Sequence, residues 1–498
     1  MFHCFSILHS YVCTVCKHPI FFIILYALFF TLFQYMQGIQ YSWDSNWYLL
    51  FSKSISQNLD FERKAVYAPL YYWSLGIFQL FGLSCKESII ACWLIYYSTI
   101  LFCYYAISQR LLISLSGLLF ISSTTTTALF FRYAWTELGY ASLLVAITSV
   151  LFVNINHIYA KRTFFLFIFF LSMLPIQRYI GGYVAIYFGF IFLLSSVSFH
   201  DFLKKIFGLI IATIPFICVI AWNFIISDGI SGSRSPAEFS FYQNLIFSLQ
   251  VINDFFLPQW VLWFLLTLSC IPLSAYFFPH KSLQYKMCFI FIFLLPLVQL
   301  LAQTHSSSVY KIDPINPRFF IILTPLFYLL ILILKYHFFK QLNNVYLVFL
   351  ICVFSLLNFM MSNINNYNIF NFTNIDSNKA KVFLNNISPT HIGLYIKGEK
   401  HLAADLILTN KILPQDLCQD YSIYGDFIQK GTLQYKPNCN NKNGHIYHMI
   451  TDEVTMNLPV ILISKKGLPS NWKSAFAIQN TYQIQDINSF YALVKREQ

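Results

Sequence analysis

The sequence has unusually few charged residues. Only 10% of its 498 residues are Asp, Glu, Lys or Arg, whereas an ordinary soluble domain contains about 25%. Hydrophobic residues make up 57% of the chain and include 54 Phe and 33 Tyr. A soluble core cannot bury this much apolar surface, but a lipid bilayer can accommodate it. The composition therefore excludes a soluble globular protein and indicates an integral membrane protein with many spans.

The sequence also lacks a basic patch and a compact metal-binding motif. Its net charge of +12 is spread over short loops between apolar segments, whereas a nucleic-acid binder gathers basic residues on one face. We therefore expect no nucleic-acid partner. Cys13 and Cys16 form a CxxC pair without a second pair, which is a weak metal signal. Cys418 and Cys439 could form a disulfide in an oxidising compartment, and the sequence leaves this open.

Long apolar segments recur along most of the chain. Each is about 20 residues long, which is enough to cross a bilayer as an α-helix. The first segment lacks the small residues of a signal-peptide cleavage site, so we interpret it as a retained helix. About eleven transmembrane helices are predicted, over residues 19–38, 87–107, 111–129, 138–154, 163–177, 180–198, 206–226, 257–278, 287–303, 319–336 and 345–362.

Two segments between the first two spans are predicted as helices at the membrane surface. In residues 47–59, Trp47, Leu50 and Phe51 share one face of a helix and polar residues share the other, which is an interfacial pattern. Residues 69–81 are apolar, but they lie too close to the next span to cross the bilayer separately.

The Lys and Arg residues indicate an orientation. If the N-terminus is cytoplasmic, the cytoplasmic loops contain ten basic residues and one acid, Asp201, and the opposite loops contain nine basic and nine acidic residues. The excess of basic residues is slight, but the cytoplasmic loops are shorter, so the density of Lys and Arg favours this orientation. Residues 1–362 are then a transmembrane domain, and residues 363–498 form a soluble domain outside the cytoplasm. We expect a small α/β fold there, because short apolar stretches alternate with helix-like ones. These are His391–Tyr395, Ile446–Ile450, Val460–Ile463 and the helix-like Asn378–Asn386.

Ionisable residues near a membrane are functional candidates because they are costly to place there. In this topology they gather in the external loops. The acids are Asp44 and Glu137, the basic residues are Arg132, Arg178, Arg234, Arg318 and Lys64, and nearby aromatic residues are Tyr48, Tyr71 and Tyr133. A carboxylate can accept the proton of an attacking hydroxyl, and guanidinium groups can bind a phosphate. Tyr rings can stack on sugars.

Several of these residues also have a purely structural explanation. Asp44 precedes a predicted helix, and Asp is a favoured helix cap. Glu137 lies at a predicted helix start, where the helix dipole favours an acid. Arg178 and Arg318 could extend to the bilayer edge as anchors. The residues alone leave both explanations open.

The order and spacing of these motifs resemble the GT-C superfamily of glycosyltransferases that use polyprenyl-phosphate sugars. The likeness is to the branch with protein O-mannosyltransferases and aminoarabinose transferases, and it covers about residues 19–340. The matching elements are Trp43-Asp44 through Leu59, Pro69–Tyr72 with Phe81-Gly82, Arg132-Tyr133 with Glu137, Arg178-Tyr179 with Gly181, and Pro317-Arg318-Phe319 with Pro325. Relatives often place Lys immediately before the Pro-Leu motif, whereas Lys64 lies five residues before Pro69. Many relatives have Asp where this chain has Glu137.

The resemblance implies an all-α, GT-C-like polytopic membrane protein of the cell envelope, in the inner membrane of a bacterium. The implied activity is transfer of a hexosyl or pentosyl group from a polyprenyl-phosphate donor to a lipid, protein or glycan acceptor on the periplasmic or lumenal face. Asp44 would act as the base and Glu137 would orient the acceptor. Arg178 and Arg318 would bind the donor phosphate, supported by Arg132, Arg234 and Lys64.

The sequence contains no compact metal-ligand motif, although two external carboxylates could bind a divalent metal ion. Two other classes of function remain open. A transporter or a lipid or glycan flippase would need facing charges near the middle of the membrane and pseudo-symmetric halves, and the sequence shows neither. A membrane scaffold that presents the C-terminal domain would not need a cluster of acids and arginines on its loops.

Overall fold

The computed structural model describes residues 19–37, 43–57, 67–123, 125–156, 161–227, 239–277, 282–310, 317–339 and 343–370, a few single residues between them, and five β-strands of the C-terminal region. The chain falls into two compact units. The first contains residues 1–40, 51–58 and 63–366, and the second contains residues 41–50, 59–62 and 367–498.

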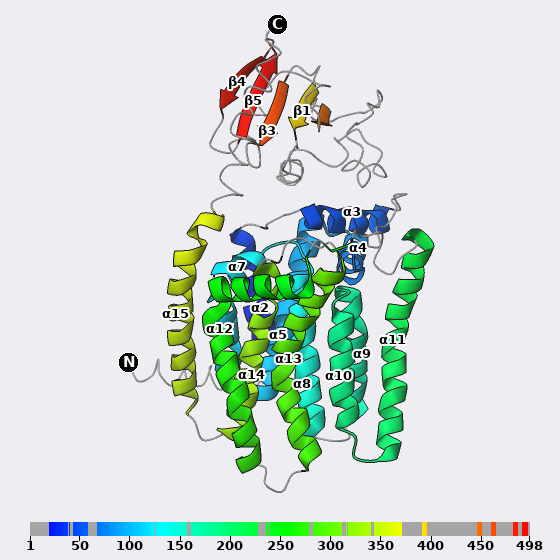
Figure 1. Ribbon diagram of the computed structural model, residues 1–498, viewed down its shortest axis with the longest axis vertical. Helices are drawn as coiled ribbons and strands as arrows, with labels where there is room; N and C mark the ends of the chain where they lie inside the picture. Colours follow the sequence, from blue (N-terminus) through cyan, green and yellow to red (C-terminus); the bar gives the residue numbers. More distant parts are fainter. Residues whose placement is uncertain are drawn as a thin grey trace, which may run out of the picture. The chain divides into compact units, whose positions relative to one another are not determined.

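Helices make up the described part of the chain before the C-terminal strands (Figure 1). They are α2 (Pro19–Met36), α3 (Trp43–Gln57), α4 (Leu70–Leu80), α5 (Cys85–Ser108), α6 (Leu111–Ile121), α7 (Thr125–Phe130), α8 (Glu137–Asn156), α9 (Lys161–Gln177), α10 (Gly181–Leu194), α11 (Phe199–Ser227), α12 (Phe241–Phe277), α13 (Leu283–Val309), the 3-10 helix η1 (Pro317–Phe319), α14 (Leu323–Phe338) and α15 (Asn344–Phe370).

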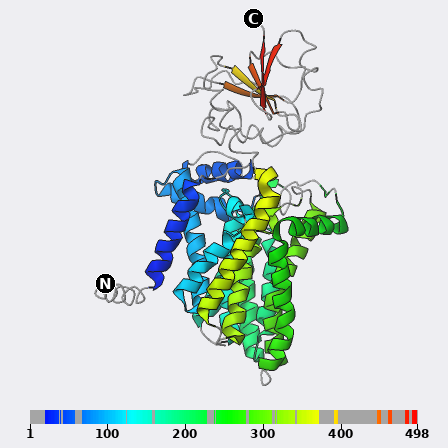
Figure 2. The same ribbon diagram turned by 90° about the vertical axis from the view of Figure 1, so that its left-hand side faces the viewer.

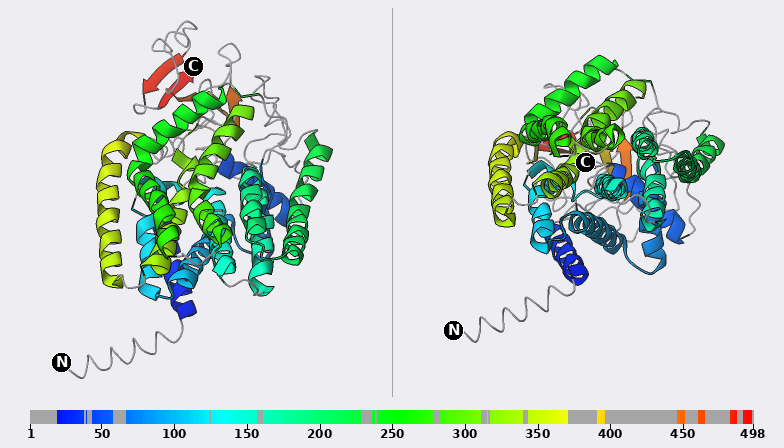
Figure 3. Two further views of the ribbon diagram at one scale, coloured as in Figure 1. Left: turned by 60° about the horizontal axis from the view of Figure 1, so that its bottom comes forward. Right: turned by 90° about the horizontal axis from the view of Figure 1, so that it is seen from below.

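Every segment predicted as a transmembrane span contains a helix. Within the described ranges, seven helical segments are long and apolar enough to cross a membrane, and four shorter apolar helices occupy the other predicted spans. Most of the helices of the first unit run side by side, as the view from below shows (Figure 3). The chain is therefore an integral, multi-pass membrane protein, whereas eleven crossings remain a prediction.

The predicted span 111–129 is divided into two helices. Helix α6 ends at Ile121, and the short α7 begins at Thr125. Between them the hydroxyl of Ser122 donates to the carbonyl of Leu118 at 2.8 Å, and that of Ser123 donates to the carbonyl of Phe120 at 2.7 Å. Such side-chain bonds compete with the helical backbone, and the β-branched threonines that follow are weak helix formers. The short loop that contains Arg132 follows α7, and Glu137 then begins α8.

Helix α12 begins well before its predicted span at 257–278. It has 37 residues, or about 55 Å, which exceeds the roughly 30 Å of a bilayer core. The helix is bent, so that its N-terminal part lies across the neighbouring helices while the remainder runs along them (Figures 1 and 2). Pro258 lies inside the helix, and proline is the usual cause of such a bend. The predicted span was too short because the helix bends at Pro258 without ending there.

Helix α14 lies at the centre of the first unit. In the segment Pro317–Phe338, 89% of an 18-residue apolar stretch is buried inside the structure. The hydroxyl of Tyr104 donates to the carbonyl of Pro325 at 2.7 Å, and the hydroxyls of Ser116 and Tyr328 lie 2.8 Å apart. Hydrogen bonds of this kind join helices in a membrane. Because η1 directly precedes α14, the most buried helix positions Arg318.

Helices α3 and α4 occupy the two segments predicted to lie at the membrane surface. They pack against each other through the amide of Gln79, which donates to the hydroxyl of Ser52 at 2.8 Å and accepts from that of Ser56 at 3.0 Å. Gly76 permits the close approach, because a Cβ there would lie 2.9 Å from Ile55. Their location at the membrane surface remains a prediction.

The second unit contains a five-stranded mixed sheet. Its strands are β1 (His391–Tyr395), β2 (Ile446–Ile450), β3 (Val460–Ser464), β4 (Tyr482–Asp486) and β5 (Tyr491–Arg496), in the order β2-β1-β3-β5-β4. Strand β1 pairs in parallel with β2 and β3, and β5 pairs antiparallel with β3 and β4. The three apolar stretches singled out in the sequence are strands. The helix-like Asn378–Asn386, Cys418 and Cys439 lie outside the described residues, so the α/β class remains a prediction.

Candidate functional site

One carboxylate, that of Glu137, lies beside two guanidinium groups. Its Oε1 atom lies 3.2 Å from Nη1 of Arg178 and 3.8 Å from Nε of Arg318. The Glu137 side chain is 5% exposed, and each arginine side chain is 14% exposed. Among the described residues, two guanidinium groups therefore lie against one carboxylate in a nearly buried position.

Three separate elements of the chain bring these residues together. Glu137 is the first residue of α8, Arg178 follows the last residue of α9, and Arg318 is the middle residue of η1. The turn after α9 is tight, since the N–H of Gly181 donates to the carbonyl of Arg178 at 2.8 Å. A Cβ at Gly181 would lie 2.5 Å from the carbonyl oxygen of Leu174, so only glycine fits there.

Aromatic rings surround both guanidinium groups. Cζ of Arg318 lies 5.0 Å from the ring centre of Trp135 and 5.1 Å from that of Phe319. Trp135 in turn stacks on Tyr133, with 4.1 Å between ring centres and 14° between planes. Arg178 lies 5.8 Å from the Phe319 ring and 5.9 Å from the Tyr140 ring. Cation–π attraction of this kind is strongest where water is excluded, so the rings help to hold the arginines.

Arg132 has a different environment. Its Nη1 donates to the backbone carbonyl of Gln37 at 2.9 Å, which joins the loop before α8 to the end of α2. Burial lowers the pKa of the Arg132 guanidinium, and the nearby Tyr133 and Tyr97 oppose this change. An arginine whose pKa is lowered in this way still carries its charge at neutral pH. Its predicted role in phosphate binding remains untested.

Some of the other predicted site residues lie within the described part of the structure and others do not. Lys64 and Arg234 lie outside the described residues. Asp44 is in the first turn of α3, but its side chain lies outside the description, and Asp44 and Tyr48 belong to the second compact unit. Tyr71 is fully buried in α4. Of the predicted site residues, the structure brings together Glu137, Arg178 and Arg318, with Tyr133 joined to them through Trp135.

Gln177 is a contributor that the sequence reasoning missed. Its Nε2 donates to the backbone carbonyl of Thr136 at 3.1 Å, and its side chain is almost completely buried. Gly139 makes room for this contact, since a Cβ there would lie 2.4 Å from Nε2 of Gln177. A signal was present in the sequence, because an amide at the end of an otherwise apolar helix needs a partner inside the membrane.

A buried polar stripe on α13 was also missed. The stripe consists of Gln299, Gln303 and Ser307, which follow one another at i, i+4 spacing and so share one helix face. Gln299 accepts a hydrogen bond from the hydroxyl of Tyr140 at 2.9 Å, and Gln303 donates to Ser307 at 3.3 Å. The spacing could have identified this stripe as the inward face of the helix.

The contacts of the described residues do not test the prediction of a bound divalent metal ion. Among the described residues, no three His, Cys, Asp or Glu side chains lie together in a way that could hold a metal ion. The prediction depended on a pair of external carboxylates, and the side chain of Asp44 lies outside the description.

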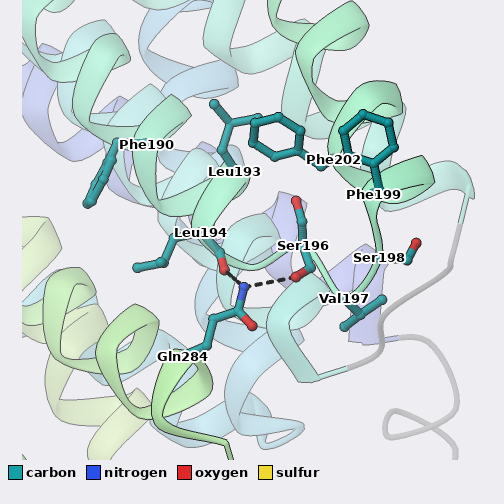
Figure 4. A pocket seen from close by; sticks show the side chains of 9 residues that line it. All are labelled: Phe190, Leu193, Leu194, Ser196, Val197, Ser198, Phe199, Phe202 and Gln284. Carbon is teal, nitrogen blue, oxygen red and sulfur yellow. Dashed lines mark hydrogen bonds between the residues drawn. The ribbon is translucent and has the colours of Figure 1, made fainter.

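An open groove with a volume of about 630 Å³ lies away from the arginine cluster. Its lining includes Leu194, Ser196, Phe202 and Gln284, and Nε2 of Gln284 donates to the carbonyls of Leu194 and, at 2.8 Å, Ser196 (Figure 4). The groove lies at the C-terminal end of α10, whereas Arg178 precedes its N-terminal end. The 14 residues of α10 separate the two by about 21 Å, so the groove does not belong to this site.

Comparisons with known proteins reveal a shared fold. No protein-family model matches the sequence, and no curated protein matches it. The structure is similar to a crystal structure of ArnT from Cupriavidus metallidurans bound to undecaprenyl phosphate, with a TM-score of 0.52 and 10% identity over 95% of this chain and 97% of that chain. A crystal structure of ArnT from the same organism in the apo state gives a TM-score of 0.45 at 10% identity, over 92% and 93% of the two chains. The first comparison shows that this chain has an ArnT-like polytopic membrane fold.

Proposed function

We propose that this protein is a membrane glycosyltransferase that moves a sugar from a polyprenyl-phosphate donor to an acceptor outside the cytoplasm. The observation that carries the proposal is the cluster of Glu137, Arg178 and Arg318, in which two guanidinium groups share one carboxylate. Guanidinium groups bind the oxygen atoms of a phosphate with matching geometry, and this cluster holds two of them close together. The donor phosphate is the anion that this reaction requires.

The shared fold supports the same chemistry. The similar ArnT crystal structure was obtained with undecaprenyl phosphate bound, and undecaprenyl phosphate is itself a polyprenyl phosphate. This agrees with the resemblance of the sequence motifs to the GT-C superfamily. The finer identity of the donor sugar and of the acceptor, and the bacterial inner membrane as the location, are parts of the proposal.

In the proposed reaction, an acceptor hydroxyl attacks the anomeric carbon of the donor sugar. The bond between that carbon and the phosphate oxygen breaks, the acceptor proton passes to Asp44, and polyprenyl phosphate leaves. Negative charge grows on the phosphate as the bond breaks, and Arg178 and Arg318 stabilise it because they are already in position. Arg132, Arg234 and Lys64 support the phosphate, and Tyr48, Tyr71 and Tyr133 lie near the sugar.

The contacts of Glu137 favour a role different from the one expected. Its Oε1 atom already faces both guanidinium groups, at 3.2 and 3.8 Å, so Glu137 is placed to hold the two arginines. We assign Glu137 to the holding of the two guanidinium groups and leave the base to Asp44. A divalent metal ion near the external carboxylates would strengthen phosphate binding, and addition of a chelator to the transfer assay tests for it.

The test is transfer of radiolabelled sugar from a panel of polyprenyl-phosphate donors in membranes. Wild type should transfer label from at least one donor, and Asp44→Asn should transfer none although it inserts normally. Arg178→Ala should lose about 100-fold or more, the scale of a lost transition-state donor. Arg110→Ala is the matched control, because Arg110 is exposed in the turn between α5 and α6 and should keep full activity. Folded wild type that uses no donor would contradict the proposal.

A transporter or flippase is the alternative. It would use charges near the middle of the membrane, whereas the pair Glu137–Arg178 joins the first residue of α8 to the residue after α9. Movement of labelled lipid phosphate across vesicles without any sugar transfer would favour this alternative.

A further inference from the structure

Two consecutive residues at the end of α9 contact two consecutive residues at the start of α8. The amide of Gln177 donates to the backbone carbonyl of Thr136 at 3.1 Å. The guanidinium of the next residue, Arg178, lies 3.2 Å from the carboxylate of Glu137, which follows Thr136. The first contact joins a side chain to the backbone, and the second joins two charged side chains.

The ion pair alone does not set the direction of the Arg178 side chain. Nη1 of Arg178 makes no hydrogen bond, although it lies within reach of the carboxylate. Its direction therefore depends on where the end of α9 is held relative to α8. The contact of Gln177 with Thr136 holds it, because a hydrogen bond to the backbone fixes the position of the helix end itself.

The surroundings of Gln177 show that this contact is built into the packing. Gln177 is 1% exposed and Thr136 is 4% exposed. The carbonyl of Thr136 also accepts the N–H of Tyr140 at 2.9 Å, so the amide of Gln177 adds a second hydrogen bond to a carbonyl that belongs to the first turn of α8. Gly139 lies one turn of α8 beyond Thr136, where a side chain would displace both Gln177 and Tyr96. Nε2 of Gln177 therefore lies in a space that only the absence of a side chain at Gly139 provides.

We infer that Gln177 is a positioning residue for phosphate recognition, which acts by holding Arg178 in the geometry that binds the donor phosphate. This inference rests on the proposed function. Gln177 itself touches neither the phosphate nor the sugar in this assignment. Its removal should therefore weaken recognition of the phosphate without changing recognition of the lipid chain.

The experiment compares binding of undecaprenyl phosphate and of uncharged undecaprenol to the purified full-length protein. The Gln177→Met variant keeps the volume of the side chain and removes its hydrogen bond. It should bind undecaprenyl phosphate about tenfold more weakly, the scale of one lost hydrogen bond, and should bind undecaprenol as wild type does. A purely structural role would weaken binding of both lipids equally.

Gln303→Met is the matched control. Gln303 is also buried, at 2% exposure, and its hydrogen bond stays within α13. This variant should keep the wild-type preference for the phosphate. A thermal unfolding scan of each variant shows whether it is folded.

A double-mutant cycle gives the decisive comparison. If Gln177 acts through Arg178, Gln177→Met should cause no further loss of phosphate binding in an Arg178→Ala background, since the two effects share one cause. Additive losses, or equal losses in Gln177→Met and Gln303→Met, would overturn the inference. A wild-type protein that does not distinguish undecaprenyl phosphate from undecaprenol would instead contradict the proposed function, so the two failures differ.

Discussion

The two ends of helix α10 carry buried charges in contrasting arrangements. Before its first residue, Glu137 faces both Arg178 and Arg318 at 3.2 and 3.8 Å. Beyond its last residue, Asp201 and Lys205 form one pair at 3.1 Å. Among the described residues, the first group joins two arginines to one acid, and the second joins one lysine to one acid.

The balanced pair also has its other hydrogen bonds in place. Asp201 accepts from the backbone N–H of Val197 at 3.2 Å, and Lys205 donates to the hydroxyl of Ser195 at 2.9 Å. These contacts close the turn between α10 and α11. A pair that binds its own turn has a structural purpose, whereas the two arginines beside Glu137 each keep 14% of the side chain exposed, and the proposed function assigns them to an anionic ligand.

The largest expected effect is on stability at the balanced end. Lys205→Met should lower the free energy of unfolding by about 3–5 kcal/mol, because it leaves the buried Asp201 without its partner. Denaturant unfolding in detergent measures this. Transfer activity per folded molecule should stay at the wild-type value, and a selective loss of activity would mean that this end takes part in the reaction.

The opposite outcome is expected for Arg318→Ala. Glu137 keeps Arg178 as a partner, so the free energy of unfolding should change by less than about 2 kcal/mol, below the cost of an uncompensated buried charge. Transfer should fall by about 100-fold, because one of the two groups that stabilise the leaving phosphate is lost. Initial rates measured beside Lys205→Met check the comparison. Unchanged transfer by a folded Arg318→Ala protein would remove Arg318 from the site.

A packing change near the site should have an intermediate effect. In Gly139→Ala the added methyl group meets Gln177 at 2.4 Å and Tyr96 at 2.8 Å, so we expect a loss of about 1–3 kcal/mol in stability from overpacking. Gly182→Ala is the control, since its nearest contact is Phe216 at 3.7 Å, and it should be nearly neutral. Thermal unfolding of the two variants measures the difference, and equal midpoints would show that the α8–α9 contact is looser than described.

The smallest effect is expected for Glu137→Gln. If Glu137 holds the arginines and does not accept the proton, this variant should keep measurable transfer, reduced by about tenfold, the scale of weakened charge-assisted hydrogen bonds. Asp44→Asn measured in the same assay provides the contrast. Complete loss of transfer in Glu137→Gln, at normal insertion, would mean that Glu137 takes part in the reaction itself.

Much of the fold was predictable because the signals for it are local. An apolar segment of about 20 residues in a membrane protein must be a helix, and a helix occupies each predicted span. The errors fell where local rules compete. The serines and threonines after Ile121 divided one span, and Pro258 concealed the true length of α12.

The candidate site was predictable only in part. The cost of ionisable residues near a membrane identified Glu137, Arg178 and Arg318 as candidates, but it could not say which residues meet. Gln177 escaped attention because an uncharged amide near a helix end has many ordinary explanations. Its partner is a backbone carbonyl of another helix, and a backbone carbonyl has no sequence signature.

The sequence by itself determined that this is a membrane protein. It also determined which segments form most of the helices and which charged residues lie near the ends of those helices. These properties depend on the free energy of transferring a short segment from water to lipid. That free energy is set by the composition of the segment itself and does not depend on its neighbours. Only the tertiary structure decided that two arginines share one glutamate while Asp201 and Lys205 balance each other. Such pairings depend on the packing of helices that are distant in the sequence, and no segment alone contains that information.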